Sequence, residues 1–545
     1  MKHLKVALSD SVQSKIKSIA GRTCVGVFET DFTDVGAVVI DDGELDLVNN
    51  NQISSFGIPV IVLRLDASKD ISLYGNRITS IIDFLSMSID DCISEIEKVV
   101  ANYEASILPP FFRALSDYVG DENSQFDCPG HQGGQFFYKH PTGRAFYNFF
   151  GENIFRADLC NADVKLGDLL IHEGYAYDAQ AHAAKVYNAD KTYFVLNGTS
   201  SANKVVLNAL LTPGDIILYD RNNHKSICHG GLVMSGATPI YLETARNPFG
   251  SIGGILDHCF DESYIRQLVA EKSPEKANAK RPIRLAVIQL GTYDGTIYNA
   301  RQVVDKIGHL CDYIFFDSAW VGYEQFIPMM KDCSPLLLEL GPNDPGILVT
   351  QSVHKQQAGF SQTSQIHKKD SHIKGQERYV DHKRFNNSFM MHASTSPFYP
   401  LFASLDVNAK IHEGQLGQTL WRECVEVAID ARKAVLKQCK YLRPLVPPIV
   451  HGKPWEEGNT HEMACDVKYF AFEPEAKWHS FNGYGEGQYF IDPCKFQLIT
   501  PGINVETGEY EEFGIPANIL ANYLRENRII PEKCDLNTIL FLMTP

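Results

Sequence analysis

Five short, largely apolar runs constrain the fold of this chain more than any other feature. They cover residues 193–196, 215–219, 285–290, 313–316 and 347–349, and helical segments separate them. Strands that are apolar on both faces must be covered on both faces, which is typical of a parallel sheet between layers of helices. The fold class is therefore α/β. Because ligands of such sheets bind at the carboxyl ends of the strands, the residues that follow these runs are the first candidates for function.

The bulk composition narrows the class of partner. The chain has 545 residues, 13 cysteines and a net charge of -16. Negative charge disfavours a nucleic-acid partner, because nucleic-acid binding relies on clustered Lys and Arg. The cysteines form no CxxC pair and no His-Glu pair completes HExxH, so we predict no metal site. No apolar run reaches the roughly 18 residues of a membrane span and the start does not resemble a signal peptide, so we expect a cytoplasmic protein without membrane contact.

The loop after the first run, NGTSSANK at 197–204, offers hydroxyl and backbone N–H groups at the start of a helix. This arrangement suits a phosphate, because the helix dipole and the unpaired N–H groups favour an anion. The same residues also fit an ordinary Ser or Thr helix cap, which is the simpler interpretation of this stretch alone. It is not a Walker A loop, because no GK[ST] closes it.

Two further strand ends carry titratable side chains. Asp317 follows the fourth run, where a carboxylate is unfavourable unless a cation or hydrogen-bond donors face it, although it could equally cap the next helix. Lys355 follows the fifth run, with Ser352 and His354 beside it. A buried lysine with a lowered pKa can form a Schiff base, although a surface lysine is commoner. An anion cradle, an aspartate and such a lysine in one sheet are together the set that a pyridoxal phosphate site requires.

Longer stretches of the sequence resemble one enzyme family. They are FDCPGHQGG (126–134), FRADLCNADVKLGDLLIHEG (155–174), YFVLNGTSSANK (193–204), FDSAWVGYEQF (316–326), SVHKQQAGFSQTSQIH (352–367) and STSPFYP (394–400). These stretches are similar to those of the bacterial ornithine/lysine/arginine decarboxylases, which are pyridoxal-phosphate enzymes of the aspartate-aminotransferase fold (fold type I). The similarity extends over essentially the whole chain and is strongest to the ornithine decarboxylases of this family.

The resemblance implies an order of domains. It predicts a flavodoxin-like wing domain at 1–105, a helical linker at 106–160, a large cofactor-binding domain at 161–410 and a small α/β domain at 411–545. It also implies a homodimer or higher homo-oligomer with active sites at the interface. Family members continue into a further C-terminal domain, so we expect the small domain to be truncated on its C-terminal side.

The resemblance also assigns roles to the candidate residues. Lys355 would bind the cofactor as a Schiff base, and Asp317 would pair with the pyridinium nitrogen. His224 would stack on the ring, and Trp320 would form a wall of the pocket. Four further residues would contact the phosphate or surround the Schiff base, namely Thr199, Ser200, Ser352 and His354. The neighbouring subunit would contribute Thr395 and Ser396.

The implied reaction is decarboxylation of L-ornithine to putrescine and CO2, in polyamine synthesis or in the response to acid. An acidic side chain must meet the distal ammonium, and the candidates are Glu509, Glu511 and Glu512, which fit a solvated loop equally well. Lysine or arginine decarboxylation is the near alternative. From a different class, the chain could be a catalytically inactive, truncated partner that only assembles with full-length subunits.

Overall fold

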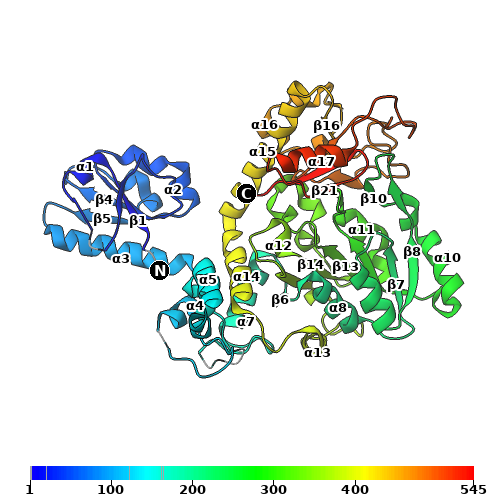
Figure 1. Ribbon diagram of the computed structural model, residues 1–545, viewed down its shortest axis with the longest axis horizontal. Helices are drawn as coiled ribbons and strands as arrows, with labels where there is room; N and C mark the ends of the chain where they lie inside the picture. Colours follow the sequence, from blue (N-terminus) through cyan, green and yellow to red (C-terminus); the bar gives the residue numbers. More distant parts are fainter. Residues whose placement is uncertain (1–2, 20, 122, 161–162, 164) are drawn as a thin grey trace. The chain divides into compact units, whose positions relative to one another are not determined.

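Two compact units, Met1–Pro109 and Pro110–Pro545, make up this chain. The computed structural model describes residues 3–19, 21–121, 123–160, 163 and 165–545 (Figure 1). The predicted domain boundary at residue 161 lies outside the described residues, and the predicted boundary at residue 105 differs by four positions from the division between the units. In the part of the chain that the structure describes, no helix is long and apolar enough to cross a membrane.

The first unit is a five-stranded parallel sheet with the order β2-β1-β3-β4-β5, which is the strand order of flavodoxin-like folds. Its strands are β1 (Lys5–Leu8), β2 (Cys24–Gly26), β3 (Val35–Asp41), β4 (Val60–Arg64) and β5 (Ser80–Asp83). Successive residues of β3 enter two different cores: Ala37 and Val39 pack with α3 (Ile89–Ile107), and Val38 and Ile40 pack on the other face. The sheet is therefore covered on both sides.

The second unit is built on a seven-stranded sheet with the order β6-β15-β14-β13-β11-β7-β8. Each of the five apolar runs coincides with one of its strands to within one residue at either end of the run: β6 (Lys191–Val195), β7 (Ile216–Asp220), β11 (Ile283–Gln289), β13 (Cys311–Ser318) and β14 (Gly346–Gln351). The expectation of a wholly parallel sheet is wrong in one strand. β15 (Ser364–Lys369) runs antiparallel to both β14 and β6, whereas β8 (Thr238–Leu242) extends the parallel part at the far edge.

Helices cover both faces of this sheet. Along β13, Ile314 and Phe316 join one core while Tyr313 and Phe315 join the other, so alternate side chains point to opposite faces. The helices α7 (Tyr175–Val186) and α8 (Gly198–Leu210) pack on the sheet. The helices α13 (His382–His392) and α14 (Tyr399–Ile411) pack on α8 and α7 and reach β6 through the rings of Phe385 and Phe402. The two-faced burial expected from the apolar runs is thus confirmed.

The rest of the second unit surrounds this sheet. The segment predicted as a linker contains α4 (Pro110–Gly120), α5 (Pro141–Phe150) and α6 (Glu152–Arg156). After α15 (Gly414–Gln438), an antiparallel sheet forms with the order β16-β20-β22-β21, and α17 (Ala517–Glu526) packs on it. Its strands are β16 (Arg443–Pro444), β20 (Lys495–Ile499), β21 (Lys533–Cys534) and β22 (Thr538–Leu542). β12 (Thr296–Tyr298) pairs with β19 (Tyr489–Ile491) and so joins the segment after β11 to the C-terminal region.

Candidate active site

Asp317 lies at the carboxyl end of β13 and is only 3% exposed. Its Oδ2 accepts a hydrogen bond from Asn203 Nδ2 at 2.8 Å, and its Oδ1 accepts one from the backbone N–H of Ala319 at 3.1 Å. Asn203 is itself fully buried, and its Oδ1 accepts a hydrogen bond from Thr350 Oγ1 at 2.8 Å. Hydrogen-bond donors therefore face the buried carboxylate, and a second side chain orients the main donor.

Asp317 and Lys355 influence each other's ionisation. Burial raises the pKa of Asp317, and the hydrogen bond from Asn203 and the positive charge of Lys355 oppose that rise. Burial lowers the pKa of Lys355 to about 8, and the negative charge of Asp317 is the largest effect against that fall. The lowered pKa increases the share of Lys355 that is a neutral amine near neutral pH, and the neutral amine is the nucleophilic form.

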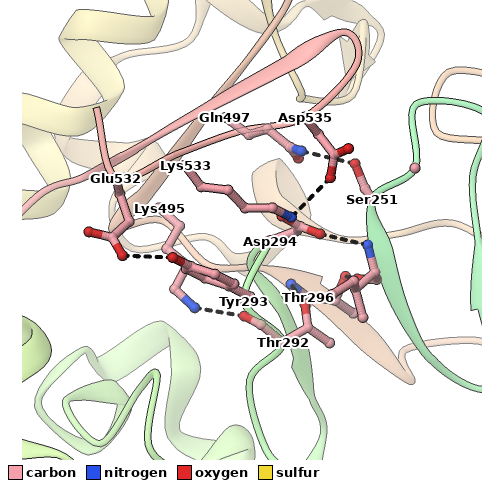
Figure 2. A network of polar contacts seen from close by, with 12 residues as sticks. Ser251, Thr292, Tyr293, Asp294, Thr296, Lys495, Gln497, Glu532, Lys533 and Asp535 are labelled. Carbon is pink, nitrogen blue, oxygen red and sulfur yellow. Dashed lines mark hydrogen bonds and ion pairs between the residues drawn. The ribbon is translucent and has the colours of Figure 1, made fainter. Parts of the chain in front are cut away.

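Lys355 faces an aromatic wall that consists of Trp320 and Tyr293. Lys355 lies on α12 (Val353–Gln356), directly after β14, and its Nζ is 3.7 Å from the centroid of the Trp320 ring. The ring of Tyr293 stacks on Trp320 with centroids 4.1 Å apart and planes at 21°. The hydroxyl of Tyr293 donates a hydrogen bond to Glu532 Oε1 at 2.8 Å (Figure 2). The negative charge of Glu532 raises the pKa of Lys355, so this carboxylate acts on the same site.

Three hydroxyl groups meet beside α12. Thr199 Oγ1 is 2.6 Å from Ser352 Oγ and 2.8 Å from Ser364 Oγ. They come from the first turn of α8, the residue before α12 and the first residue of β15. Within the described residues, the Asn197 side chain at the N-cap makes no hydrogen bond to α8. The N–H of Gly198 donates to the carbonyl oxygen of Gln362 at 2.8 Å, so the N–H groups that can meet an anion are those of the next residues of the first turn. Such a cluster of hydroxyl and N–H groups can hold an anion.

His224 is tied to Asp317 through two side chains. The Nδ1 of His224 accepts a hydrogen bond from the backbone N–H of Ser226 at 3.3 Å and lies 2.8 Å from Ser226 Oγ. That Oγ accepts a hydrogen bond from Asn203 Nδ2 at 3.0 Å. Burial lowers the pKa of His224, which favours the neutral ring. His354, the other predicted histidine, places its Nδ1 2.7 Å from the carbonyl oxygen of Thr363.

Several candidate residues lie apart from this cluster in the single chain. Glu509, Glu511 and Glu512 are exposed in the loop after β20, and Thr395 and Ser396 are also exposed. Ser200 is exposed as well, but it directly follows Thr199 in the first turn of α8. Ser396 lines a cavity of about 160 Å³ together with Leu196 and Asn197.

Sequence reasoning missed several residues of the cluster, namely Asn203, Thr350, Ser364, Tyr293 and Glu532. For Asn203 the sequence does carry a signal. Asn203 lies four residues after Thr199 in a helical segment, so the two side chains share one face of α8. Tyr293 and Glu532 carried no comparable signal.

Comparisons with known proteins agree with this geometry. The family model described as "Orn/Lys/Arg decarboxylase, major domain" matches residues 109–545. The ornithine decarboxylase of Haemophilus influenzae is 64% identical over 546 residues, which cover 100% of this chain and 76% of that protein. The inducible ornithine decarboxylase of Escherichia coli is 62% identical over 547 residues, or 100% of this chain and 74% of that protein. The inducible lysine decarboxylase of Escherichia coli is 36% identical over 480 residues, or 87% of this chain and 63% of that protein.

Solved structures show the same similarity. Lysine decarboxylase A from Pseudomonas aeruginosa superposes with a TM-score of 0.88 at 30% identity, over 100% of this chain and 76% of that chain. The lysine decarboxylase of Francisella novicida gives a TM-score of 0.87 at 29% identity, over 100% and 75% of the two chains. This chain thus spans about three quarters of the length of these structures and of the two ornithine decarboxylases.

Proposed function

Since the chain belongs to the Orn/Lys/Arg decarboxylase family, we propose that it decarboxylates L-ornithine to putrescine and CO2 with pyridoxal 5'-phosphate as cofactor. Its second unit has the aspartate-aminotransferase-like fold of that family. The observation that carries the choice of substrate is the identity of 64% to an ornithine decarboxylase over the whole chain, against 36% to a lysine decarboxylase.

The clustered side chains fit this cofactor. Lys355 would hold its aldehyde carbon, Asp317 would face its ring nitrogen, and His224 would lie on the ring face. Thr199 and Ser352 of the hydroxyl cluster would hold the phosphate, with Ser200 in the same turn of α8 and His354 next to Ser352. Ser364, whose hydroxyl donates to the carbonyl oxygen of Gln351 at 2.8 Å, would support Thr199 from behind. The orientation of Asp317 by Asn203 supports this fit, because a buried carboxylate with donors behind it favours a cation in front of it.

The residues of the chain then have separate tasks. When bound, the cofactor supplies an acceptor for the electron pair that remains on Cα as CO2 leaves. Asp317 would keep a proton on the ring nitrogen, which stabilises negative charge that develops only during the reaction. Lys355 can exchange with the substrate amine because its lowered pKa leaves part of it neutral. Trp320 and Tyr293 exclude water from one side of the pocket.

Glu532 is our candidate for binding the distal ammonium of ornithine. Its carboxylate is solvent-accessible, and its charge acts on Lys355, the residue at the reacting end of the site. Tyr293 also orients it from the aromatic wall. Glu509, Glu511 and Glu512 have no such link to Lys355 among the described contacts, so the candidates expected from the sequence are less well supported.

We also propose that the enzyme is a cytoplasmic homodimer or higher homo-oligomer. Thr395 and Ser396 would contribute to the site of the neighbouring subunit, and their exposure in the single chain supports this. An apolar groove of about 540 Å³, which includes Phe112 and Phe360, also supports a contact between subunits.

A substrate comparison tests the proposed function. The purified chain with added pyridoxal phosphate is supplied with ornithine, lysine or arginine, and the released diamine and CO2 are measured. We expect the highest kcat/KM for ornithine, and activity on lysine without activity on ornithine would contradict the proposal.

A lysine substitution tests the cofactor site itself. Lys355→Ala should lose both the visible absorbance of the bound cofactor and its covalent trapping by borohydride. Lys374→Ala, which changes an exposed lysine, should retain both. A visible band of unchanged intensity in Lys355→Ala would mean that another residue holds the cofactor.

A further inference from the structure

Lys533 lies at the centre of an ion triad next to Glu532. Its Nζ is 2.6 Å from Asp294 Oδ1 and 3.2 Å from Asp535 Oδ2 (Figure 2). The Asp294 side chain is only 3% exposed, whereas that of Asp535 is 37% exposed. The contact with Asp294 is therefore the shielded one, and it is screened less by solvent than the contact with Asp535.

Asp294 is firmly anchored on its other side. Its Oδ2 accepts the backbone N–H of Ile252 at 2.8 Å, so both carboxylate oxygens are engaged. The turn that carries Asp294 is also fixed, because buried Lys495 donates to the carbonyl oxygen of Thr292 at 2.7 Å. Thr292 Oγ1 in turn donates to the carbonyl oxygen of Ile252 at 3.1 Å. The 292–296 turn is thus a fixed support for the segment that contains Lys533.

Two neighbouring cross-links join the same two segments. Asp294 contacts Lys533, and the preceding residue of each segment makes the second link, from Tyr293 to Glu532. The Lys533 ammonium also lies 5.3 Å from the centroid of the Tyr293 ring, where a cation–π attraction adds to the link. β21, which begins at Lys533, is a two-residue edge strand. Its backbone is held to β22, because the N–H of Glu532 donates to the carbonyl oxygen of Leu540 at 2.9 Å, but this pairing does not fix the direction of the Glu532 side chain. The ion pair of Lys533 with Asp294 and the hydrogen bond of Tyr293 to Glu532 together hold this short strand to the 292–296 turn.

We propose that Lys533 is a positioning residue that sets the length of the accepted substrate, because it fixes the Glu532 carboxylate relative to Lys355. This inference rests on the proposed function, in which Lys355 and Glu532 meet the two ends of a diamino acid. Ornithine and lysine differ by one methylene group, and a well-fitted site discriminates such a difference by about 10- to 200-fold. Discrimination of that size requires a carboxylate whose position does not adapt to the longer chain.

The test compares Lys533→Met with Lys533→Arg in the holoprotein. Lys533→Met removes the charge and nearly keeps the volume, so we expect the KM for ornithine to rise and the ratio of kcat/KM for ornithine over lysine to fall about tenfold or more. Lys533→Arg should restore part of that ratio. The dissociation constant of ornithine, measured from its perturbation of the cofactor absorbance, should rise in parallel with KM.

Two controls separate this effect from a general loss of structure. Lys477→Met breaks an exposed pair with Glu506, whose atoms are 3.1 Å apart, and should leave KM and the ratio unchanged. The visible cofactor band and its borohydride trapping should be the same in Lys533→Met and wild type, because Lys533 does not contact Lys355. An unchanged ratio and an unchanged ornithine dissociation constant in Lys533→Met would overturn the proposal.

A second variant keeps the test decisive if Lys533→Met does not fold. Tyr293→Phe removes the hydroxyl that bonds to Glu532 and keeps the ring that stacks on Trp320. It should lower the same ratio, and wild-type values in Tyr293→Phe would overturn the proposal. If the wild type decarboxylates lysine but not ornithine, the proposed function fails. The positioning role is then judged by the KM for lysine, which must rise in Lys533→Met.

Discussion

At the scale of single residues, two lysines lie close to the same indole, Lys495 buried and Lys355 half-buried. The Nζ of Lys355 is 3.7 Å and that of Lys495 is 5.4 Å from the centroid of the Trp320 ring. Burial lowers the pKa of each to about 8, and the positive charge of Lys355 is among the effects that lower the pKa of Lys495. The site therefore holds two amines that lose their protons far more easily than a solvated lysine.

This has a consequence for stability at alkaline pH. Because the folded-state pKa of Lys355 is below its ordinary value of 10.5, the unfolded chain binds more protons between about pH 8 and 10.5, and this lysine makes stability rise with pH in that window. Relative to Lys355→Met, the cofactor-free wild type should gain about 1 kcal/mol per pH unit from pH 8 to 9.5 in urea unfolding. Buried cysteine thiols make stability fall with pH in the same window. Because both proteins contain them, the difference between the two proteins isolates the effect of Lys355. Equal pH slopes for the two would contradict the prediction.

A second prediction concerns the hydrogen bond behind Asp317. Thr350→Val keeps the shape of the side chain but leaves Asn203 Oδ1 without its donor, which costs about 1–3 kcal/mol for a buried group. Because Asn203 then orients Asp317 less well, the dissociation constant of pyridoxal phosphate should rise about tenfold, as measured by absorbance titration. The exposed Thr142→Val should bind the cofactor as wild type does, and wild-type affinity in Thr350→Val would show that Asn203 needs no orientation.

How far the sequence alone predicts such a site depends on where its residues lie. Thr199, Asp317 and Lys355 could be named because each follows an apolar strand, and apolar runs mark strand ends. Asn203 could not, because an asparagine within a helical pattern has no visible partner until the helix is placed on the sheet. Glu532 is brought near Lys355 by tertiary contacts that no local pattern encodes.

At the scale of secondary-structure elements, β15 shows why one strand of the sheet was not predicted. Its residues include Ser364, Gln365 and His367, which are fully buried although they are polar. Gln365 donates to Gln351 Oε1 at 2.8 Å, and His367 Nδ1 lies 2.8 Å from Thr192 Oγ1. Cross-strand hydrogen bonds replace apolar contacts here, so a search for apolar runs passes over this strand.

The start of β15 and the first turn of α8 act together in our assignment of the phosphate site. Thr199→Val removes a hydroxyl that links the two elements, so the dissociation constant of pyridoxal phosphate should rise about tenfold. Binding of pyridoxal, which lacks the phosphate, should change little in the same variant. Ser86→Ala, at an exposed position of the first unit, is the matched control. If the variant loses equal affinity for pyridoxal phosphate and for pyridoxal, the Thr199 hydroxyl does not act on the phosphate.

At the scale of the whole molecule, the two units have separate cores. The sheet of the first unit is covered on both faces by its own side chains. We therefore expect a chain that begins at Leu108 to fold and to show the visible band of bound pyridoxal phosphate. Size-exclusion chromatography of this shortened chain measures its assembly separately from cofactor binding. Failure to bind the cofactor would mean that the second unit depends on the first.

The reversed strand β15 also bears on how a new molecule is made. β6 lies at the edge of its sheet and pairs with β15, Tyr193 opposite Ile366, although the ribosome makes β6 much earlier. Until β15 emerges, the peptide groups of β6 have no neighbouring strand, and an open sheet edge invites aggregation. The hydroxyl cluster is incomplete for the same period because Ser364 belongs to β15. If the hydroxyl cluster holds the cofactor as we propose, we expect cofactor loading to follow the synthesis of β15, and we expect a translational pause before residue 364 to leave the edge of β6 open for longer.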